Sequence, residues 1–323
     1  MPNVITHGLM ANEVVQLLEK SDVALAIETY PQLFFFGSNG PDYLFYYRYF
    51  SSDEDAKSMR QLGNLFHDEY INEFYTAAKN HLNRLENDQD KQMALSYIAG
   101  HLCHWALDSL AHPYVFHKTG LIEGDTRYDH YRFEAMIDTL VVKRVQNKKF
   151  MDVPSYKFVK LNAKEKVSVA KVYQAITFEV LGKRVELKKF VDAMSMTYNF
   201  NLLLFDKIGL RSRLIRPIEK YILKDEWVFT SHLVTPDVDI KNDILNLRRD
   251  EWSHPCDSEM KSTASFMDLF HQSTIRAYQA LNALTKDLAH GTNSLEEFID
   301  GRNYSTGLSE PCDMINFDII YKH

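Results

Sequence analysis

The stretch GHLCHWALDSLAHPYVFH, residues 100–117, carries four histidines around a single aspartate. In an α-helix, positions four apart lie one turn apart on the same face, so His104, Asp108 and His112 would form one row. A carboxylate has two oxygens, so Asp108 can bind one metal ion with His104 and reach a second with His112. Pro113 disfavours helical geometry at the residue before it, and we therefore expect the helix to end at His112. The spacing predicts a helix that presents a row of metal ligands.

Helical periodicity continues over most of the chain. Apolar residues recur at the spacing of one helix face, whereas no region alternates apolar and polar residues for long enough to predict a convincing strand. With 45% hydrophobic residues, the chain can bury a sizeable core. The sequence therefore predicts an all-α, multi-helix fold. The expected helices cover residues 11–20, 59–84, 91–112, 128–146, 164–181, 187–208, 212–222 and 262–288.

A Lys-rich stretch, KKFMDVPSYKFVKLNAKEK, follows the His-rich part of the chain and starts just before residue 150. We expect residues 1–150 to form a metal-binding helical core that carries the His, Asp and Glu side chains of a site. Residues 151–323 would form a helical C-terminal half that packs with the first as one unit.

Charge and cysteine content restrict the class of protein. A formal charge of −7 argues against binding long nucleic acid through a basic surface, although a nuclease whose metals supply positive charge stays open. The odd number and wide spacing of Cys103, Cys256 and Cys312 predict a reducing compartment and no disulfide framework, with Cys103 in the core. The sequence shows no signal-peptide pattern and no apolar stretch of membrane-spanning length, so we expect a cytoplasmic protein.

Other imidazoles and carboxylates accompany the row. His130 and Glu134 repeat the four-residue spacing, and His67 falls within an expected helix. Asp42 ends the turn signal GSNGPD, and His7 opens the first helix. Carboxylate and imidazole ligands without thiolate are the set that suits zinc in hydrolytic sites.

Each residue also has a simpler explanation. His7 and His67, considered singly, are more readily explained as packed or capping residues, and His104 with Asp108 as a hydrogen-bonded pair. The repeated spacing favours metal binding for the group. His101 shares the face of Asp108 but lies about 10 Å from it along the helix axis, too far to share an ion. His117, beyond the proline, is expected at the surface or beside the ligands.

Ten of the twenty-one residues in YPQLFFFGSNGPDYLFYYRYF, residues 30–50, are aromatic. One interpretation is a core loop packed under helices. The other is an apolar wall beside the site, suited to lipid chains or another apolar leaving group.

The order of these motifs resembles that of a known family. The run G-x3-H-x3-D-x3-HP from Gly100 to Pro113 is similar to the zinc-dependent phospholipase C family, as are Thr6–His7, the Gly40–Asp42 tripeptide, the helical His67 and the H-x3-E of 130–134. LNLRRDEWSHP and SFMDLF in the second half resemble intracellular bacterial members. The resemblance implies an all-helical fold and a site related in design to fungal nucleases that cleave single-stranded nucleic acid with three zincs.

The resemblance also implies ligand sets for two or three zinc ions. Secreted members complete the third site with the backbone of an N-terminal Trp, whereas this chain begins MPNVIT and has no Trp there. Asp42 would be a ligand or the base that acts on the attacking water. The implied sets are His67, His104 and Asp108 for one ion, His112, His130 and Glu134 for a second that Asp108 bridges, and His7 for a third.

These features predict a zinc-dependent phosphodiester hydrolase of phospholipase C type, in which metal-bound hydroxide attacks phosphorus in a phospholipid or another small phosphodiester. One alternative keeps the zinc and changes the substrate to a nucleotide or oligonucleotide, with Tyr43, Tyr46 or Tyr47 stacking on a base. Another is a non-catalytic binding protein that zinc stabilises. The chain carries no G-x-S-x-G elbow, P-loop or dinucleotide fingerprint.

Overall fold

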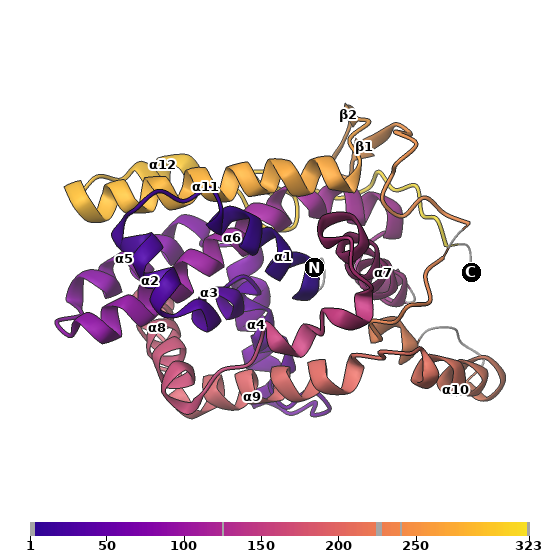
Figure 1. Ribbon diagram of the computed structural model, residues 1–323, viewed down its shortest axis with the longest axis horizontal. Helices are drawn as coiled ribbons and strands as arrows, with labels where there is room; N and C mark the ends of the chain where they lie inside the picture. The colour runs from indigo at the N-terminus through magenta and orange to yellow at the C-terminus, as the bar shows by residue number, and fades with distance from the viewer. Residues whose placement is uncertain (1–3, 125, 224–227, 240, 322–323) are drawn as a thin grey trace.

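The computed structural model describes residues 4–124, 126–223, 228–239 and 241–321 (Figure 1). Its centre is helix α6, Asp88–Thr119, which is buried along nearly its whole length from Met93 onward. Helix α11, Phe266–His290, runs beside α6 along one side of the molecule, and α8, Ala163–Leu181, and α9, Leu187–Leu204, lie toward the opposite side. The predicted all-α class is confirmed.

The remaining elements surround this centre. Two short antiparallel strands, which the sequence did not indicate, lie between α10 and α11 in chain order. Short 3₁₀ turns include η1, Gly40–Tyr46, and Thr230–His232. The other helices and strands are α1 Val4–Val15, α2 Asp22–Thr29, α3 Pro31–Gly37, α4 Glu54–Asp68, α5 Ile71–Arg84, α7 Thr126–Gln146, α10 Leu210–Ile218, α12 Ser294–Ile299, β1 Trp252–His254 and β2 Asp257–Ser262.

Close backbone packing places α3 against α6. A Cβ atom added at Gly37 would lie 2.2 Å from the carbonyl oxygen of Tyr97, and one added at Gly100 would lie 2.0 Å from that of Phe34. Only glycine fits at such distances. The contact fixes where α3 ends and thus where the following turn η1, with Asp42, lies relative to α6.

Several expected helix bounds are wrong. The first helix covers Val4–Val15 instead of 11–20, because Asp138 on α7 accepts hydrogen bonds from the backbone amides of Ile5 and Thr6 and so caps the helix earlier. The helix expected over 59–84 is two helices, interrupted at Tyr70, whose φ of 56° is left-handed. The aromatic stretch forms α3 and η1 rather than a loop, and most of it is core.

Pro113 does not end α6, so the predicted stop at His112 is wrong. The proline leaves the carbonyl of Ser109 without its helical amide partner. The C-terminal segment packs tightly at this point, since a Cβ added at Gly307 would lie 2.0 Å from the Ser109 oxygen. Side chains on both sides of the proline are fully buried, and this packing outweighs the local preference for a break.

Cys256 and Cys312 form a disulfide, so the expectation of no disulfide is wrong. The bond joins the hairpin of β1 and β2 to the C-terminal segment. Disulfides are typical of oxidising compartments, and the cysteines therefore no longer support the predicted cytoplasmic location. Cys103 is buried, as expected. No helix in the described part of the chain is long and apolar enough to cross a membrane.

The C-terminal half shares the core of the first half. Helix α11 packs against α6 and α1, and α12 against α5. The division of the chain at residue 150 stays a prediction.

Candidate metal centre

Helix α6 presents the predicted row. The Nε2 atom of His104 lies 3.0 Å from Oδ2 of Asp108, and Nδ1 of His112 lies 3.8 Å from the same oxygen. All three side chains are buried, the His104 and Asp108 residues completely. Three polar groups at successive turns therefore face the interior of the molecule, where they require partners.

Helix α1 adds His7 to this row. Its Nε2 atom lies 3.1 Å from Oδ1 of Asp108, and its ring centroid lies 4.3 Å from that of His104. The hydrogen bonds that Asp138 accepts from the start of α1 include one from the hydroxyl of Thr6, the residue before His7. Asp138 thus holds the backbone that positions His7.

The turn η1 and helix α4 supply Asp42 and His67. Oδ1 of Asp42 lies 2.9 Å from Nε2 of His67 and 3.7 Å from Nε2 of His104. Gly40 permits this approach, because it has a φ of 51° and a Cβ there would lie 2.1 Å from the His104 ring. The turn therefore brings a carboxylate against the row.

Helix α7 supplies His130 and Glu134 at the predicted four-residue spacing. Nε2 of His130 lies 3.0 Å from Oε1 of Glu134, and Nε2 of His112 lies 3.8 Å from the same oxygen. These residues pack at the C-terminal part of the row on α6.

The structure thus brings all eight predicted residues together in three buried groups. The groups are His7, His104 and Asp108; Asp42, His67 and His104; and His112, His130 and Glu134. Three differences from the implied sets follow. His67 lies with Asp42 rather than with Asp108, and His104 belongs to two groups. Asp108 lies in the group of His7 and is not a member of the group of His112, His130 and Glu134.

The donor atoms fit a metal. Within the described residues, six buried side chains have an oxygen or nitrogen atom that lies near another member of the groups without the geometry of a hydrogen bond. These atoms are Nε2 of His7, Oδ1 of Asp42, Nε2 of His67, Nε2 of His104, both carboxylate oxygens of Asp108 and Nε2 of His112. Buried polar atoms without hydrogen bonds are costly unless another partner, such as a cation, satisfies them.

Hydrogen bonds on the far side of the rings orient the histidines. Nδ1 of His67 lies 2.7 Å from the carbonyl oxygen of Gly63, and Nδ1 of His112 lies 2.8 Å from that of Tyr304. Nδ1 of His104 lies 3.3 Å from the carbonyl oxygen of Ser38. When Nδ1 donates to a carbonyl, Nε2 is left as the ligand atom. No motif or spacing in the sequence identifies these carbonyl partners.

The pKa of Asp108 and the pKa values of His7 and His112 all lie below their usual values, for different reasons. Burial works to raise the pKa of Asp108, but neighbouring imidazoles, His104 first, outweigh it and hold that pKa well below its usual range. Burial lowers the pKa of His7, and it lowers that of His112 to about 3. Ionised carboxylates and neutral imidazoles are the forms that bind metal ions.

His67 behaves differently. Burial works to lower its pKa, but the carboxylate of Asp42 raises it, and the pKa lies above its usual value. The space between these two side chains thus favours a positive charge, whether a proton or a metal ion.

Two histidines of the stretch 100–117 stay outside the groups. The ring nitrogens of His101 lie 2.9 Å from the hydroxyl of Tyr75 and 3.1 Å from that of Tyr173, within a buried aromatic cluster. His117 is buried rather than at the surface, and its Nδ1 lies 3.2 Å from the carbonyl oxygen of Asn316.

Tyr304 is a contributor that the sequence did not reveal. Its carbonyl faces His112, its amide donates to the carbonyl of His67 at 2.9 Å, and its ring centroid lies 5.5 Å from that of His104. Its hydroxyl lies 2.9 Å from that of Tyr75. One residue of the C-terminal segment thus contacts α4, α5 and α6, yet no motif or spacing connects it to them.

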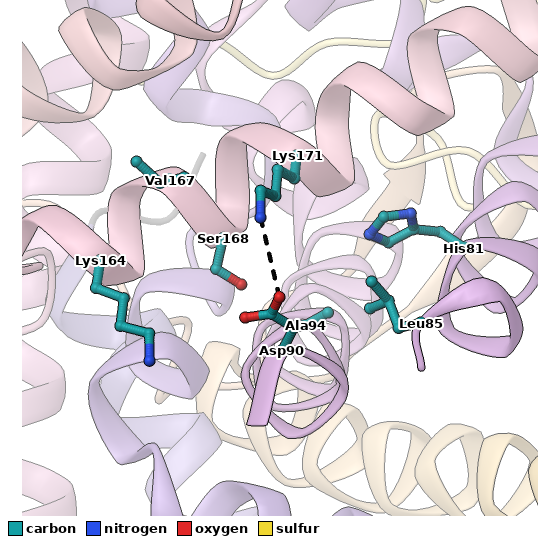
Figure 2. A pocket seen from close by; sticks show the side chains of 8 residues that line it. All are labelled: His81, Leu85, Asp90, Ala94, Lys164, Val167, Ser168 and Lys171. Atoms are coloured by element: carbon teal, nitrogen blue, oxygen red, sulfur yellow. Dashed lines mark ion pairs between the residues drawn. The ribbon is translucent and has the colours of Figure 1, made fainter. Parts of the chain in front are cut away.

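A separate small pocket lies between α5, α6 and α8 (Figure 2). Lys171 on α8 points toward Asp90 on α6, with its Nζ 3.9 Å from Oδ2 of Asp90, whereas the ammonium of Lys164 donates to the side chain of Gln89. Its lining shares no residue with the three groups.

Residues 6–182 match the family model described as zinc dependent phospholipase C. The chain belongs to the zinc-dependent phospholipase C family. The matched residues include all eight members of the three groups, and membership in this family makes the protein a zinc-dependent hydrolase. No curated protein and no solved structure matches the chain.

Proposed function

We propose that the protein hydrolyses phosphodiester bonds in phospholipids, with two or three zinc ions held by the three groups. The position of Asp108 is the observation that carries this proposal. Its carboxylate is fully buried, with one oxygen 3.1 Å from Nε2 of His7 and the other 3.0 Å from Nε2 of His104, so Asp108 and these two histidines would hold a zinc ion together. Zinc bound there would supply Lewis-acid activation of water and neutralise charge on the phosphate.

The side chains of the protein would divide the remaining work. His104, shared by two groups, would hold neighbouring ligand sets at a fixed separation. Asp42 would act as a ligand or would orient the attacking water and accept its proton, since its carboxylate borders the group of His67 and His104. The carbonyls behind His67 and His112 would keep their rings in place during the reaction.

An apolar surface beside η1 supports a lipid substrate. Tyr46 ends the turn that carries Asp42, and its ring lies 5.5 Å from that of Phe200. Phe200 also contacts the rings of Tyr49 and Phe50, and Phe50 is 86% exposed. Acyl chains would find apolar contacts here. The same rings would also stack on a nucleobase, which keeps nucleotides as the second candidate.

Release of diacylglycerol from a mixed phospholipid panel tests the proposal. Zinc-loaded protein should release it, and Asp42→Asn should remove most of the activity while the protein stays folded. Asp88→Asn, an exposed aspartate at the start of α6, is the matched control and should leave activity unchanged.

Two other results would contradict a lipid substrate. Turnover of nucleotides without turnover of phospholipids would favour a nucleotide phosphoesterase. Zinc-dependent thermal stabilisation without turnover of any phosphodiester would favour the non-catalytic binding protein.

A further inference from the structure

Exposed apolar side chains concentrate on one segment of the chain. Of the 22 exposed large apolar residues in the described part of the molecule, ten lie between residues 202 and 229. Eight come from the end of α9, from α10 and from the π-helical turn that continues it, Glu219–Leu223, and Ile208 and Phe229 lie in turns outside these elements. The ten, together called the apolar patch, are Leu202, Leu203, Ile208, Leu210, Leu214, Ile218, Tyr221, Ile222, Leu223 and Phe229.

The patch belongs to an ordered element. Helix α10 lies at one end of the molecule, beyond α9 (Figure 1). On its inner side, the carboxylate of Asp206 accepts a hydrogen bond of 2.8 Å from the amide of Ser212, and buried Glu219 accepts one of 2.8 Å from the amide of Thr230. These bonds fix the inner face. The outer face, with Leu214 63% and Ile222 71% exposed, is therefore presented as a folded surface.

Basic side chains lie among the apolar ones. Residues 207–223 contain five basic residues and one acidic residue, the buried Glu219, and Lys224, Asp225 and Glu226 follow in the sequence, whereas the whole chain has a formal charge of −7. The five basic residues are Lys207, Arg211, Arg213, Arg216 and Lys220. Arg216 is paired with Asp237 at 2.5 Å, and the guanidinium of Arg211 donates to the carbonyl of Leu203. A local positive charge on an acidic protein indicates a partner that carries negative charge.

An anionic bilayer fits this combination. Amphipathic helices that bind at membrane surfaces place bulky apolar side chains about 5–10 Å into the headgroup boundary while Lys and Arg contact anionic lipids. A second copy of the chain is a poorer partner, because a symmetric contact would place the same basic residues opposite one another.

The patch begins on α9 close to the residues that pack against η1. Leu203 lies three residues after Phe200 on α9, and Phe200 packs against Tyr46 of the turn that carries Asp42. A bilayer on the patch would therefore lie next to the side of the molecule where η1 meets α9.

We propose that the apolar patch and the basic residues of 207–223 form a docking surface for anionic phospholipid bilayers. Docking would bring lipid headgroups near the metal centre, where they would serve as substrate. This role as substrate rests on the proposed function, but binding to the bilayer does not depend on it.

Vesicle co-sedimentation tests the docking surface. Zinc-loaded Asp42→Asn protein would be mixed with vesicles of phosphatidylcholine alone or of phosphatidylcholine with phosphatidylserine, so that hydrolysis does not alter the vesicles. We expect tight binding only to the vesicles that contain phosphatidylserine, and weaker binding at high salt. Leu214→Gln combined with Ile222→Gln should weaken binding about tenfold or more, because the variant buries two fewer aliphatic side chains in the bilayer.

The matched control is Leu17→Gln combined with Leu25→Gln, two exposed leucines outside the patch, which should bind as the parent does. Three results would overturn the proposal. They are an equal loss of binding in both double variants, no binding to either kind of vesicle, and a dimer that the patch substitutions dissociate.

Hydrolysis of a soluble short-chain phosphodiester distinguishes failure of the docking surface from failure of the proposed function. Turnover of this substrate without vesicle binding would reject the docking surface alone, and vesicle binding without any turnover by the wild type would reject the proposed function alone.

Discussion

The imidazole of His7 on α1 lies 3.1 Å from Oδ1 of Asp108 on α6, while Oδ2 of the same carboxylate lies 3.0 Å from His104. Each carboxylate oxygen of Asp108 therefore lies next to a different imidazole in the interior of the protein. The first helix of the chain takes part in the metal centre through this contact. The neighbouring pair of Asp42 and His67 then reaches the row through His104.

Asp108→Asn should lower the zinc content of the purified protein and reduce phosphodiesterase activity by at least about a hundredfold. The amide keeps the shape of the side chain but removes the negative charge that balances the metal ions. Zinc content measured by mass spectrometry and activity measured on the same sample check this. The exposed Asp88→Asn variant should match the wild type, and full zinc content in Asp108→Asn would contradict the assignment.

Gly40→Ala should lose zinc, because the added methyl group would lie 2.1 Å from the His104 ring. Gly182→Ala is the matched control, since Gly182 also has a left-handed φ, of 64°, but has open space around its Cβ position. The control should lower the free energy of unfolding by about 1–2 kcal/mol without changing zinc content. Zinc titration and denaturant unfolding of both variants separate steric damage at the site from backbone strain.

His232 should make the free energy of unfolding depend on pH. Burial, assisted by Arg127, lowers its pKa from 6.5 to about 4, and its ring centroid lies 4.5 Å from that of Tyr131. Between these pKa values the unfolded chain binds a proton that the folded protein does not, so stability falls as pH drops from about 6.5 toward 4. Urea unfolding across this range should show a smaller slope for His232→Asn than for the wild type. Equal slopes would contradict the prediction.

Reduction of the Cys256–Cys312 disulfide should lower the free energy of unfolding by about 2–4 kcal/mol, because the bond restricts a loop with a sequence separation of 56 residues. Zinc binding should weaken as well, since the segment that precedes Cys312 carries Tyr304 and its contacts with His67 and His112. Unfolding and zinc affinity measured with and without dithiothreitol check both effects. The double variant Cys256→Ser, Cys312→Ser should not respond to the reductant.

The sequence by itself determined the local part of the centre. The four-residue spacings of His104 with Asp108 and of His130 with Glu134 place each pair on one helix face, since helix geometry alone fixes which positions align. The predicted helix end at Pro113 was wrong, because packing along the buried helix keeps α6 intact. The prediction of no disulfide was wrong as well, because the pairing of cysteines depends on where distant segments of the chain meet.

Only the tertiary structure decided which groups the remaining residues join. His67 lies with Asp42 because close packing of α3 on α6 sets the position of η1, and His7 reaches Asp108 because Asp138 on α7 holds the start of α1. Tyr304 reaches His112 from the C-terminal segment. Such contacts join residues far apart in the chain, and their geometry follows from the packing of whole helices, which no short-range spacing encodes.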